Sequence, residues 1–153
     1  MRTEKLFGSD LKEFDEKLKV CIVSAPYYKE ITDNLIRGAL NVLNKLNANT
    51  EIVEVSGALE IPTAISLMEK GFDGFIAVGC IIRGETTHYE IVSTESSRGL
   101  TNLGLKKICI GNAILTVENR EQAEERADPE VFDKGGEACN ALLSIIKIKK
   151  RGD

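Results

Sequence analysis

The chain has 153 residues, a length typical of one domain and short for two. Hydrophobic residues make up 42% of it and charged residues 29%, a balance typical of a globular protein rather than a disordered or membrane protein. The net charge of −4 argues against nucleic acid or an anionic membrane surface as a partner.

Apolar runs alternate along the chain with segments whose apolar residues recur at helical spacing, as in Ile31, Leu35 and Ala39. Residues 1–18 carry no such pattern, so we expect an N-terminal arm followed by a single domain over residues 19–153. The expected strands are residues 19–25, 51–55, 74–78 with its end in 79–82, and 108–115. The expected helices are residues 31–46, 62–70, 88–103, 118–127 and 135–149. Strands that are apolar along their length and alternate with helices predict an α/β fold, with a four-stranded parallel sheet between helical layers.

Membrane, secretion and metal signals are weak throughout the sequence. No apolar run approaches the roughly 20 residues that cross a bilayer, and the charged N-terminus lacks the apolar segment of a secretion signal. We therefore expect a cytoplasmic protein without a membrane partner. The chain has one histidine, and its cysteines form no CxxC pair, so we expect reduced core thiols and no metal site. The cysteines are Cys21, Cys80, Cys109 and Cys139.

Ligands of open α/β sheets bind beyond the carboxyl ends of the strands. The most informative loop in such a position is Ile81 to His88, with the sequence IIRGETTH. Gly84 allows a tight turn, Thr86 or Thr87 can cap the following helix, and the free amides of a helix start form an anion site suited to phosphate. His88 then stands beside that anion as a candidate proton shuttle. An ordinary capping loop with a surface histidine fits the spacing equally well.

Three further features are weaker when each is considered alone. Glu60, in the segment SGALE before Pro62, can accept hydrogen bonds from substrate hydroxyls, or it can simply favour a helix start through its charge. Tyr27 and Tyr28 can stack on a flat heterocycle, although single tyrosines are usually surface residues. Arg126 suits bidentate phosphate recognition, but an ordinary solvated arginine explains it as well.

Four segments together carry a resemblance to a known family. They are GALEIP (57–62), GCIIRGETTHYE (79–90), ENREQAEERA (118–127) and DKGGEA (133–138). In order and spacing they closely resemble the lumazine synthases, over nearly the whole chain from about Lys19 to Ala141, and RGETTH is the most specific part.

The resemblance implies a flavodoxin-like three-layer α/β/α sandwich that assembles into homopentamers with active sites between adjacent subunits. It implies a transferase of riboflavin biosynthesis that condenses 5-amino-6-ribitylamino-uracil with 3,4-dihydroxy-2-butanone 4-phosphate. The products are 6,7-dimethyl-8-ribityllumazine, phosphate and water. No metal and no organic cofactor is implied, and the partners are small-molecule substrates and further copies of the chain.

The resemblance also assigns roles by position. His88 corresponds to the proton-transfer residue, and Arg126 acts with the segment Gly84, Glu85, Thr86 and Thr87 at the phosphate site. The residues implied at the pyrimidine and its ribityl chain are Tyr27, Ala58, Leu59, Glu60, Cys80, Ile81, Ile82, Asn112 and Lys134. Among these, Tyr27 stacks on the pyrimidine, Glu60 binds ribityl hydroxyls, and residues 80–82 contribute through their backbone.

The chain departs from the family pattern at several positions. Pro26-Tyr27-Tyr28 stands where Arg-Phe-Asn is usual, Ser56 where proline is common, and Asn112 where an aromatic or aliphatic residue often forms a pocket wall. Shell-forming members tend to carry glycines in the loop before the last helix. Here that loop, residues 127–133, holds Pro129 and no glycine, so we expect a pentamer or a stacked pair of pentamers rather than a closed shell.

Three alternative functions stay open at this point. One is a non-catalytic protein that binds flavin or lumazine on the same fold, since a fold does not determine a function. Another is a cage protein with a vestigial site. The third uses Cys80 as a nucleophile with His88, although Cys80 ends an apolar run and lacks a clear activator.

Overall fold

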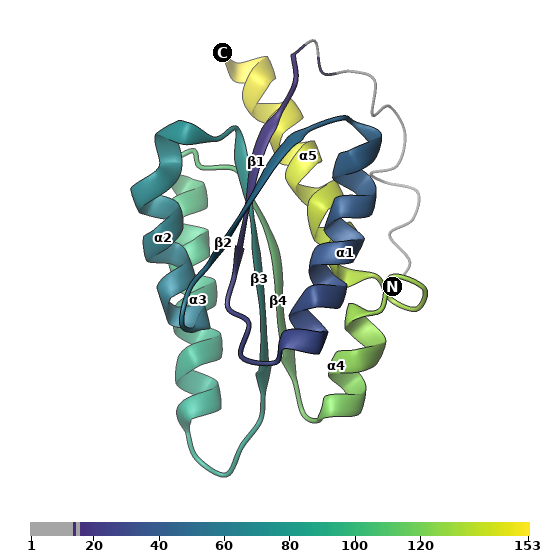
Figure 1. Ribbon diagram of the computed structural model, residues 1–153. Helices are drawn as coiled ribbons and strands as arrows, with labels where there is room; N and C mark the ends of the chain where they lie inside the picture. The colour runs from purple at the N-terminus through teal and green to yellow at the C-terminus, as the bar shows by residue number, and fades with distance from the viewer. Residues whose placement is uncertain (1–13, 15) are drawn as a thin grey trace.

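A parallel sheet of four strands forms the centre of the computed structural model, which describes residue 14 and residues 16–153 (Figure 1). The strands are β1 (Lys19–Ser24), β2 (Asn49–Glu54), β3 (Gly74–Ile82) and β4 (Ile110–Val117). Their order in the sheet is β2-β1-β3-β4. The connection after β1 leads to β2 on one side of β1, and the connection after β2 leads to β3 on the other side. The strand order therefore reverses between β1 and β3. This is where an open α/β sheet leaves a crevice for a ligand.

Helices cover both faces of the sheet, as the three-layer prediction requires (Figure 1). In the described part of the chain they are α1 (Lys29–Lys45), α2 (Ile61–Met68), α3 (His88–Leu105), α4 (Arg120–Ala127) and α5 (Lys134–Gly152), with short 3-10 turns η1 (Ala58–Glu60) and η2 (Glu69–Gly71). One core lies between the sheet and α1, α4 and α5, and a second lies beneath α2 and α3. The predicted α/β fold is confirmed.

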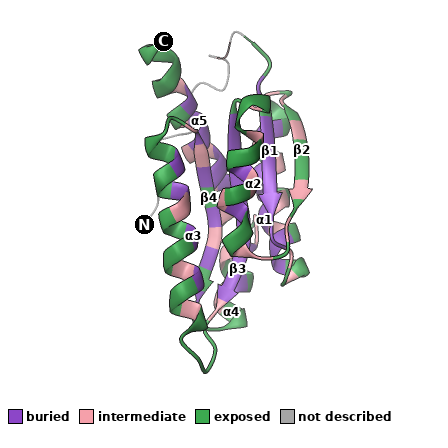
Figure 2. Ribbon diagram, turned by 90° about the vertical axis from the view of Figure 1, so that its left-hand side faces the viewer, coloured by how far each residue is buried: buried purple, intermediate pink, exposed green. Residues whose placement is uncertain are grey.

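The four strands differ in burial, contrary to the expectation that all of them are buried and apolar along their length. Residues of β1 and β3 are buried on both faces, whereas β2 is mostly exposed and β4 alternates between buried and more exposed positions (Figure 2). The expectation that all strands are apolar along their length therefore holds for β1 and β3 only. The physical reason is the strand order, because the two edge strands are covered less completely by the helical layers.

Element ends agree with the prediction to within one or two residues in most cases. The largest difference is at the end of α5, which continues to Gly152. As expected, β3 ends in residues 79–82, which stay paired with β4 up to Ile82 beside Val117. Cys80, Ile81 and Ile82 are therefore strand residues at the carboxyl edge of the sheet. The predicted arm lies mostly outside the described residues, although Phe14 packs against the core beneath α1 and α5.

The segment DKGGEA forms the start of α5, where two glycines allow a close helix crossing. A Cβ at Gly135 would collide with the backbone carbonyl of Leu35 in α1, and a Cβ at Gly136 would collide with the Asp133 carboxylate. That carboxylate caps α5 by accepting a hydrogen bond from the Gly136 amide at 3.1 Å. Most of this motif is therefore explained by packing and capping. Among the described residues, no helix is long and apolar enough to cross a membrane.

Candidate functional site

A cavity of about 500 Å³ opens at the carboxyl edge of the sheet, beside the first turns of α3. Most residues predicted for the pyrimidine and ribityl chain line it, together with His88. These predicted residues are Tyr27, Ala58, Leu59, Glu60, Cys80, Ile81, Ile82 and His88. They come from the ends of β1, β2 and β3 and from the start of α3, which are separate in sequence and meet because parallel strands all end at one edge.

Two tyrosines form one side of the cavity. Tyr27 is 80% exposed, and its ring meets that of Tyr28 edge to face, with centroids 4.9 Å apart and planes at 79°. Tyr28 is half-buried against the core, and burial raises the pKa of its hydroxyl. Tyr28 therefore packs between the core and the Tyr27 ring, and the exposed Tyr27 ring is available to a flat ligand.

Glu60 ends a 3-10 turn whose first backbone bond runs from the Glu60 amide to the Gly57 carbonyl at 3.1 Å. The backbone of Gly57 is extended, so glycine is not needed there for its conformational freedom. A Cβ at Gly57 would lie 3.0 Å from the Glu60 carboxylate, so the glycine leaves that flexible side chain room over the turn at the cavity.

The floor of the cavity is the end of β3. Cys80 and Ile81 are 8% and 9% exposed, and Ile82 is half-buried. Burial raises the pKa of the Cys80 thiol to about 11, the nearby Arg120 lowering it only in part. The thiol therefore stays protonated near neutral pH, which argues against the nucleophilic role that the sequence left open.

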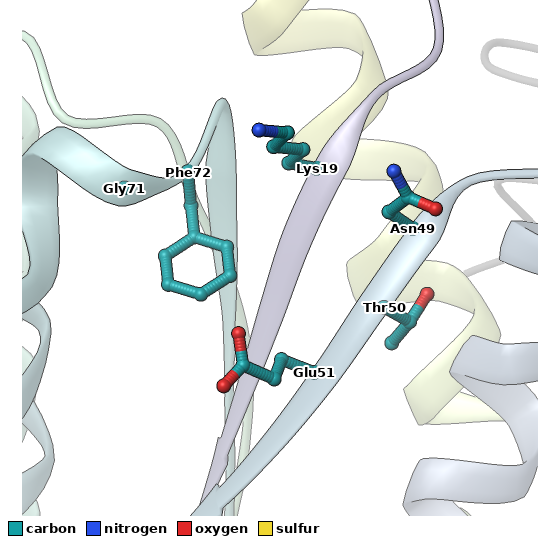
Figure 3. A pocket seen from close by; sticks show the side chains of 6 residues that line it. All are labelled: Lys19, Asn49, Thr50, Glu51, Gly71 and Phe72. Carbon is teal, nitrogen blue, oxygen red and sulfur yellow. The ribbon is translucent and has the colours of Figure 1, made fainter.

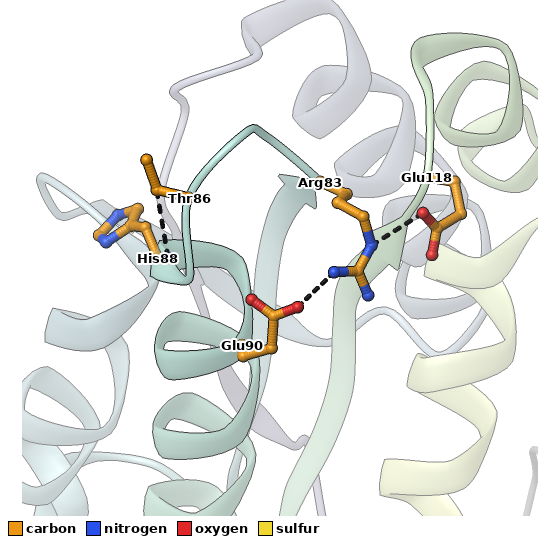
Figure 4. A network of polar contacts seen from close by, with 5 residues as sticks. All are labelled: Arg83, Thr86, His88, Glu90 and Glu118. Carbon is orange, nitrogen blue, oxygen red and sulfur yellow. Dashed lines mark hydrogen bonds and ion pairs between the residues drawn. The ribbon is translucent and has the colours of Figure 1, made fainter.

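The loop from Arg83 to Thr87 is exposed and leads directly into α3. Thr87 occupies the N-cap position, but its side chain makes no capping hydrogen bond; instead the Thr86 hydroxyl accepts a bond from the His88 amide at 3.3 Å (Figure 4). No heavy atom would contact a Cβ at Gly84, so the loop is open on that side. A long helix that begins beside an open loop offers partial positive charge to an anion.

The predicted phosphate-loop residues Gly84, Glu85, Thr86 and Thr87 adjoin the cavity in sequence but do not line it, and three further predicted residues lie elsewhere. Arg126 lies near the end of α4 and Lys134 begins α5, in the helical layer across the sheet from α3 (Figure 1). Arg126 donates to the Gln122 carbonyl at 3.3 Å and its guanidinium lies 5.7 Å from the Phe132 ring centre, whereas Lys134 pairs with Glu137 at 3.1 Å. Asn112 is exposed on the edge strand β4, where its side chain accepts a hydrogen bond from the Ile114 amide.

Sequence reasoning missed several residues that line the cavity. They are Ala25, Ser56, Gly57 and Val92, whereas Tyr28 also lines the cavity and was already a stacking candidate beside Tyr27. Helical periodicity offered a signal for Val92, since it stands four residues after His88 and so shares a face of α3 with it. Ser56 and Gly57 belong to a loop that the sequence already singled out, next to the predicted Ala58.

A second hollow, of about 450 Å³, lies at the opposite, amino ends of β1 and β2 (Figure 3). It is lined by Lys19, Asn49, Thr50, Glu51, Gly71 and Phe72. None of the predicted site residues lies there. Its position at the amino ends of the strands is also not where α/β sheets usually bind ligands.

Comparisons with known proteins fit the cavity and its surrounding loops. The family model for 6,7-dimethyl-8-ribityllumazine synthase matches residues 17–150. The chain belongs to this family. A 6,7-dimethyl-8-ribityllumazine synthase from Jannaschia sp. (strain CCS1) is 49% identical over 142 residues, covering 92% of this chain and 80% of that protein. The protein of the same name from Bartonella tribocorum is 48% identical over 145 residues, covering 92% and 96%. That from Erythrobacter litoralis is 50% identical over 132 residues, covering 85% and 94%.

Family membership identifies the chain as an enzyme and places the predicted motifs in context. The segments GALEIP and GCIIRGETTHYE supply one continuous cavity wall with its adjoining loop, whereas ENREQAEERA and DKGGEA lie in the opposite helical layer. The family motifs are thus divided between two places on one chain.

Proposed function

We propose that the cavity binds 5-amino-6-ribitylamino-uracil and that the loop Gly84 to Thr87 binds the phosphate of 3,4-dihydroxy-2-butanone 4-phosphate. The reaction of the family condenses these two compounds to 6,7-dimethyl-8-ribityllumazine, in riboflavin biosynthesis. The observation that carries the proposal is that eight residues to which the resemblance assigns roles, from segments apart in the sequence, line one cavity. The partners are therefore small molecules, and the proposed setting is the cytoplasm.

Different parts of the cavity are suited to different parts of the pyrimidine substrate. The exposed Tyr27 ring is suited to stacking on the heterocycle, and Glu60 is suited to accepting hydrogen bonds from ribityl hydroxyls, with Ala58 and Leu59 beside it. The backbone of Cys80, Ile81 and Ile82 ends the strand at the cavity floor, where its peptide groups can pair with polar ring edges.

The chemistry asks the protein mainly to align two reactive compounds. The amine attacks the ketone to give an imine with loss of water, phosphate leaves by elimination, and the ring closes with loss of a second water. Orientation alone can supply about 7–11 kcal/mol of such a barrier in favourable cases. His88, at the cavity and next to the phosphate loop, is placed to move protons in these steps.

The phosphate site needs a cation. Among the described residues of one chain, no lysine or arginine lines the cavity. Arg126 and Lys134 belong to the family motifs of the other helical layer, and Asn112 lies on the edge strand β4 at a position that the resemblance assigns to the pyrimidine pocket. We propose that a second copy of the chain supplies these three residues to the cavity, so that each active site lies between neighbours in a ring. Head-to-tail contacts of this kind close into rings, and five-fold closure is the proposed assembly.

A direct assay and a mixing experiment test these two statements separately. Purified protein mixed with both substrates should produce lumazine absorbance and fluorescence, and a protein that only binds flavin or lumazine, or only builds a cage, should not. Arg126→Ala and His88→Ala should each be weakly active, since each removes a group from every site. Subunits of the two variants, dissociated and reassembled together, should regain activity, because some sites then combine an intact His88 with an intact Arg126 from the neighbour.

A mixture no more active than its two components would contradict a site shared between copies. The variants reassembled separately provide the matched control, since each passes through the same dissociation. Loss of use of the butanone phosphate in Arg126→Ala, with pyrimidine binding kept, is the expected kinetic signature. Unchanged kinetics for the butanone phosphate would remove Arg126 from the site.

A further inference from the structure

Arg83 is the first residue after β3 and directly precedes the proposed phosphate loop Gly84 to Thr87. Its backbone amide donates to the Val117 carbonyl at 2.9 Å, so its main chain is still tied to the neighbouring strand β4. The next four residues are exposed and make few contacts. Arg83 therefore lies at the junction between the hydrogen-bonded sheet and the exposed loop.

The Arg83 side chain joins three partners from two different segments (Figure 4). Its Nε donates to the Glu118 carboxylate at 2.8 Å, and its terminal nitrogen donates to the Glu90 carboxylate in the first turn of α3. The guanidinium also lies over the Tyr89 ring, 4.2 Å from the ring centre. A planar guanidinium is suited to bridging two carboxylates while stacking on a ring, and a lysine is not.

The charges of this cluster argue against a role for Arg83 as a phosphate ligand. One guanidinium is shared between two carboxylates, so the cluster carries a net negative charge and offers an anion no free cation. The hydrogen bond from Arg83 lowers the pKa of Glu90, which keeps that carboxylate ionised. His88 points away from the cluster, on the far side of the loop (Figure 4).

Glu118 is in turn fixed to the start of α4. Its backbone amide donates to the Gln122 side chain at 2.8 Å, and the Gln122 amide donates to the capping Asn119 side chain at 2.9 Å. Helix α4 carries Arg126, so the Arg83 bridge connects the phosphate loop of a chain with the helix that bears the arginine. In the proposed ring, these two elements of one chain serve two adjacent active sites.

We infer that Arg83 is a positioning residue, which holds the phosphate loop and the first turn of α3 at a fixed place relative to α4. The inference rests on the proposed function. Because the side chains of Arg83, Glu90 and Glu118 are 41%, 51% and 57% exposed, their ion pairs contribute little to global stability. Their effect is to restrict an exposed loop, and such a restriction matters for binding and alignment rather than for folding.

The test compares Arg83→Gln, Glu118→Gln and Glu90→Gln with Arg98→Gln as the matched control. Arg98 forms an ion pair of the same kind with Glu95, at 2.8 Å on the same helix, but distant in sequence from the loop. Four quantities are measured on the assembled enzyme: the melting temperature, kcat, KM for each substrate, and the inhibition constant of inorganic phosphate.

A positioning role predicts that Arg83→Gln and Glu118→Gln raise the KM for the butanone phosphate and the phosphate inhibition constant alike. The expected rise is about tenfold, below the roughly hundredfold loss that a misplacement of about 1 Å can cause. Glu90→Gln should act in the same direction. The KM for the pyrimidine, the melting temperature and all constants of Arg98→Gln should stay close to those of the original chain.

A direct phosphate contact by Arg83 predicts the opposite sign for the glutamate variants. Removing either carboxylate would free the guanidinium, and inorganic phosphate would then bind more tightly to Glu118→Gln and Glu90→Gln. That result overturns the inference, and so does an Arg83→Gln variant with unchanged constants for phosphate and butanone phosphate. A starting protein that forms no lumazine overturns the proposed function itself, and the inference with it, before any variant is compared.

Discussion

At the level of single residues, some residues shape the cavity and others are exposed to a ligand at its opening. Cys80 and Gly57 build it, the former as a buried protonated thiol and the latter by leaving room for the Glu60 carboxylate. Tyr27 and His88 are exposed at its opening. Substitutions of these two should therefore change kinetics with little effect on the fold.

Substitution of His88 by alanine should slow turnover and leave measurable activity. Alignment and phosphate binding survive the change, whereas proton transfer by a positioned side chain is typically worth about 10²–10⁴-fold. Steady-state kcat for the variant, with pyrimidine binding measured alongside as the control for an intact site, checks the prediction. Unchanged turnover would return His88 to the role of a surface residue in a capping loop.

Substitution of Tyr27 by alanine should weaken pyrimidine binding more than substitution by phenylalanine. Stacking requires the ring, and aromatic contacts are worth about 0.5–1.5 kcal/mol beyond the area that they bury. Titration calorimetry with the pyrimidine or an analogue gives both dissociation constants. A phenylalanine variant as weak as the alanine variant would show that the hydroxyl makes the contact, as a replacement for the family's asparagine.

At the level of elements, sequence patterns predicted what each segment forms but not which segments meet. Apolar runs identified β1 and β3 because both strands are buried on two faces. The strand order does not follow from those runs, and so the exposure of β2 was not anticipated. The same limit applies to Arg83, whose partners Glu90 and Glu118 are 7 and 35 residues away and come together only in the folded sheet.

Most residues that line the cavity belong to motifs that the sequence already singled out, and this has a physical reason. Residues that touch a ligand through the ends of neighbouring parallel strands occur as short segments in loops, and such segments stand out in a sequence. Val92 was missed because its apolar side chain serves the core pattern of α3 as well as the cavity. The packing contact of Gly135 with Leu35 was likewise not anticipated, because Gly135 belongs to the segment DKGGEA, which resembled a binding segment.

Substitution of Gly135 by alanine should destabilise the protein by about 1–3 kcal/mol, the range for overpacking. The added Cβ would meet the Leu35 carbonyl, which belongs to the backbone of α1 and has little room to move. Gly104→Ala in α3 is the matched control, since a Cβ there would contact nothing within 4 Å. In a helix that change should stabilise by up to about 1 kcal/mol.

Urea unfolding at one fixed protein concentration measures both variants, because assembly makes the apparent stability depend on concentration. Opposite signs for the two glycines are the expected result. A Gly135→Ala variant as stable as the original chain would mean that α1 and α5 can separate without cost, contrary to the close crossing.

At the level of the whole molecule, one chain presents two incomplete halves of the proposed site. The cavity and the phosphate loop lie beside α3, and the cation Arg126 lies in the helical layer across the sheet. Exposed apolar side chains are also spread over both helical layers, among them Leu67 on α2, Leu105 on α3 and Ile148 on α5.

The loop between α4 and α5 bears on how far assembly goes. The turn is closed by its own hydrogen bonds, from the amides of Val131 and Asp133 to the Asp128 carbonyl and from the Glu130 amide to the Asp128 carboxylate. Pro129 restricts the same turn further. A loop held in this way is not suited to the kink that a glycine would permit.

We therefore expect a pentamer, or at most two pentamers stacked face to face, and not a closed shell. Asp128, Glu130 and Asp133 lie together in this loop, so copies that met at a further symmetry axis would bring like charges close to one another. Val131 and Phe132 of the same loop are exposed, so they offer a second ring some apolar surface beside these charges. Sedimentation velocity and light scattering in phosphate-free buffer measure the outcome. A species of five or ten chains agrees with the expectation, whereas a particle of shell size would show that this loop permits the contacts between pentamers after all.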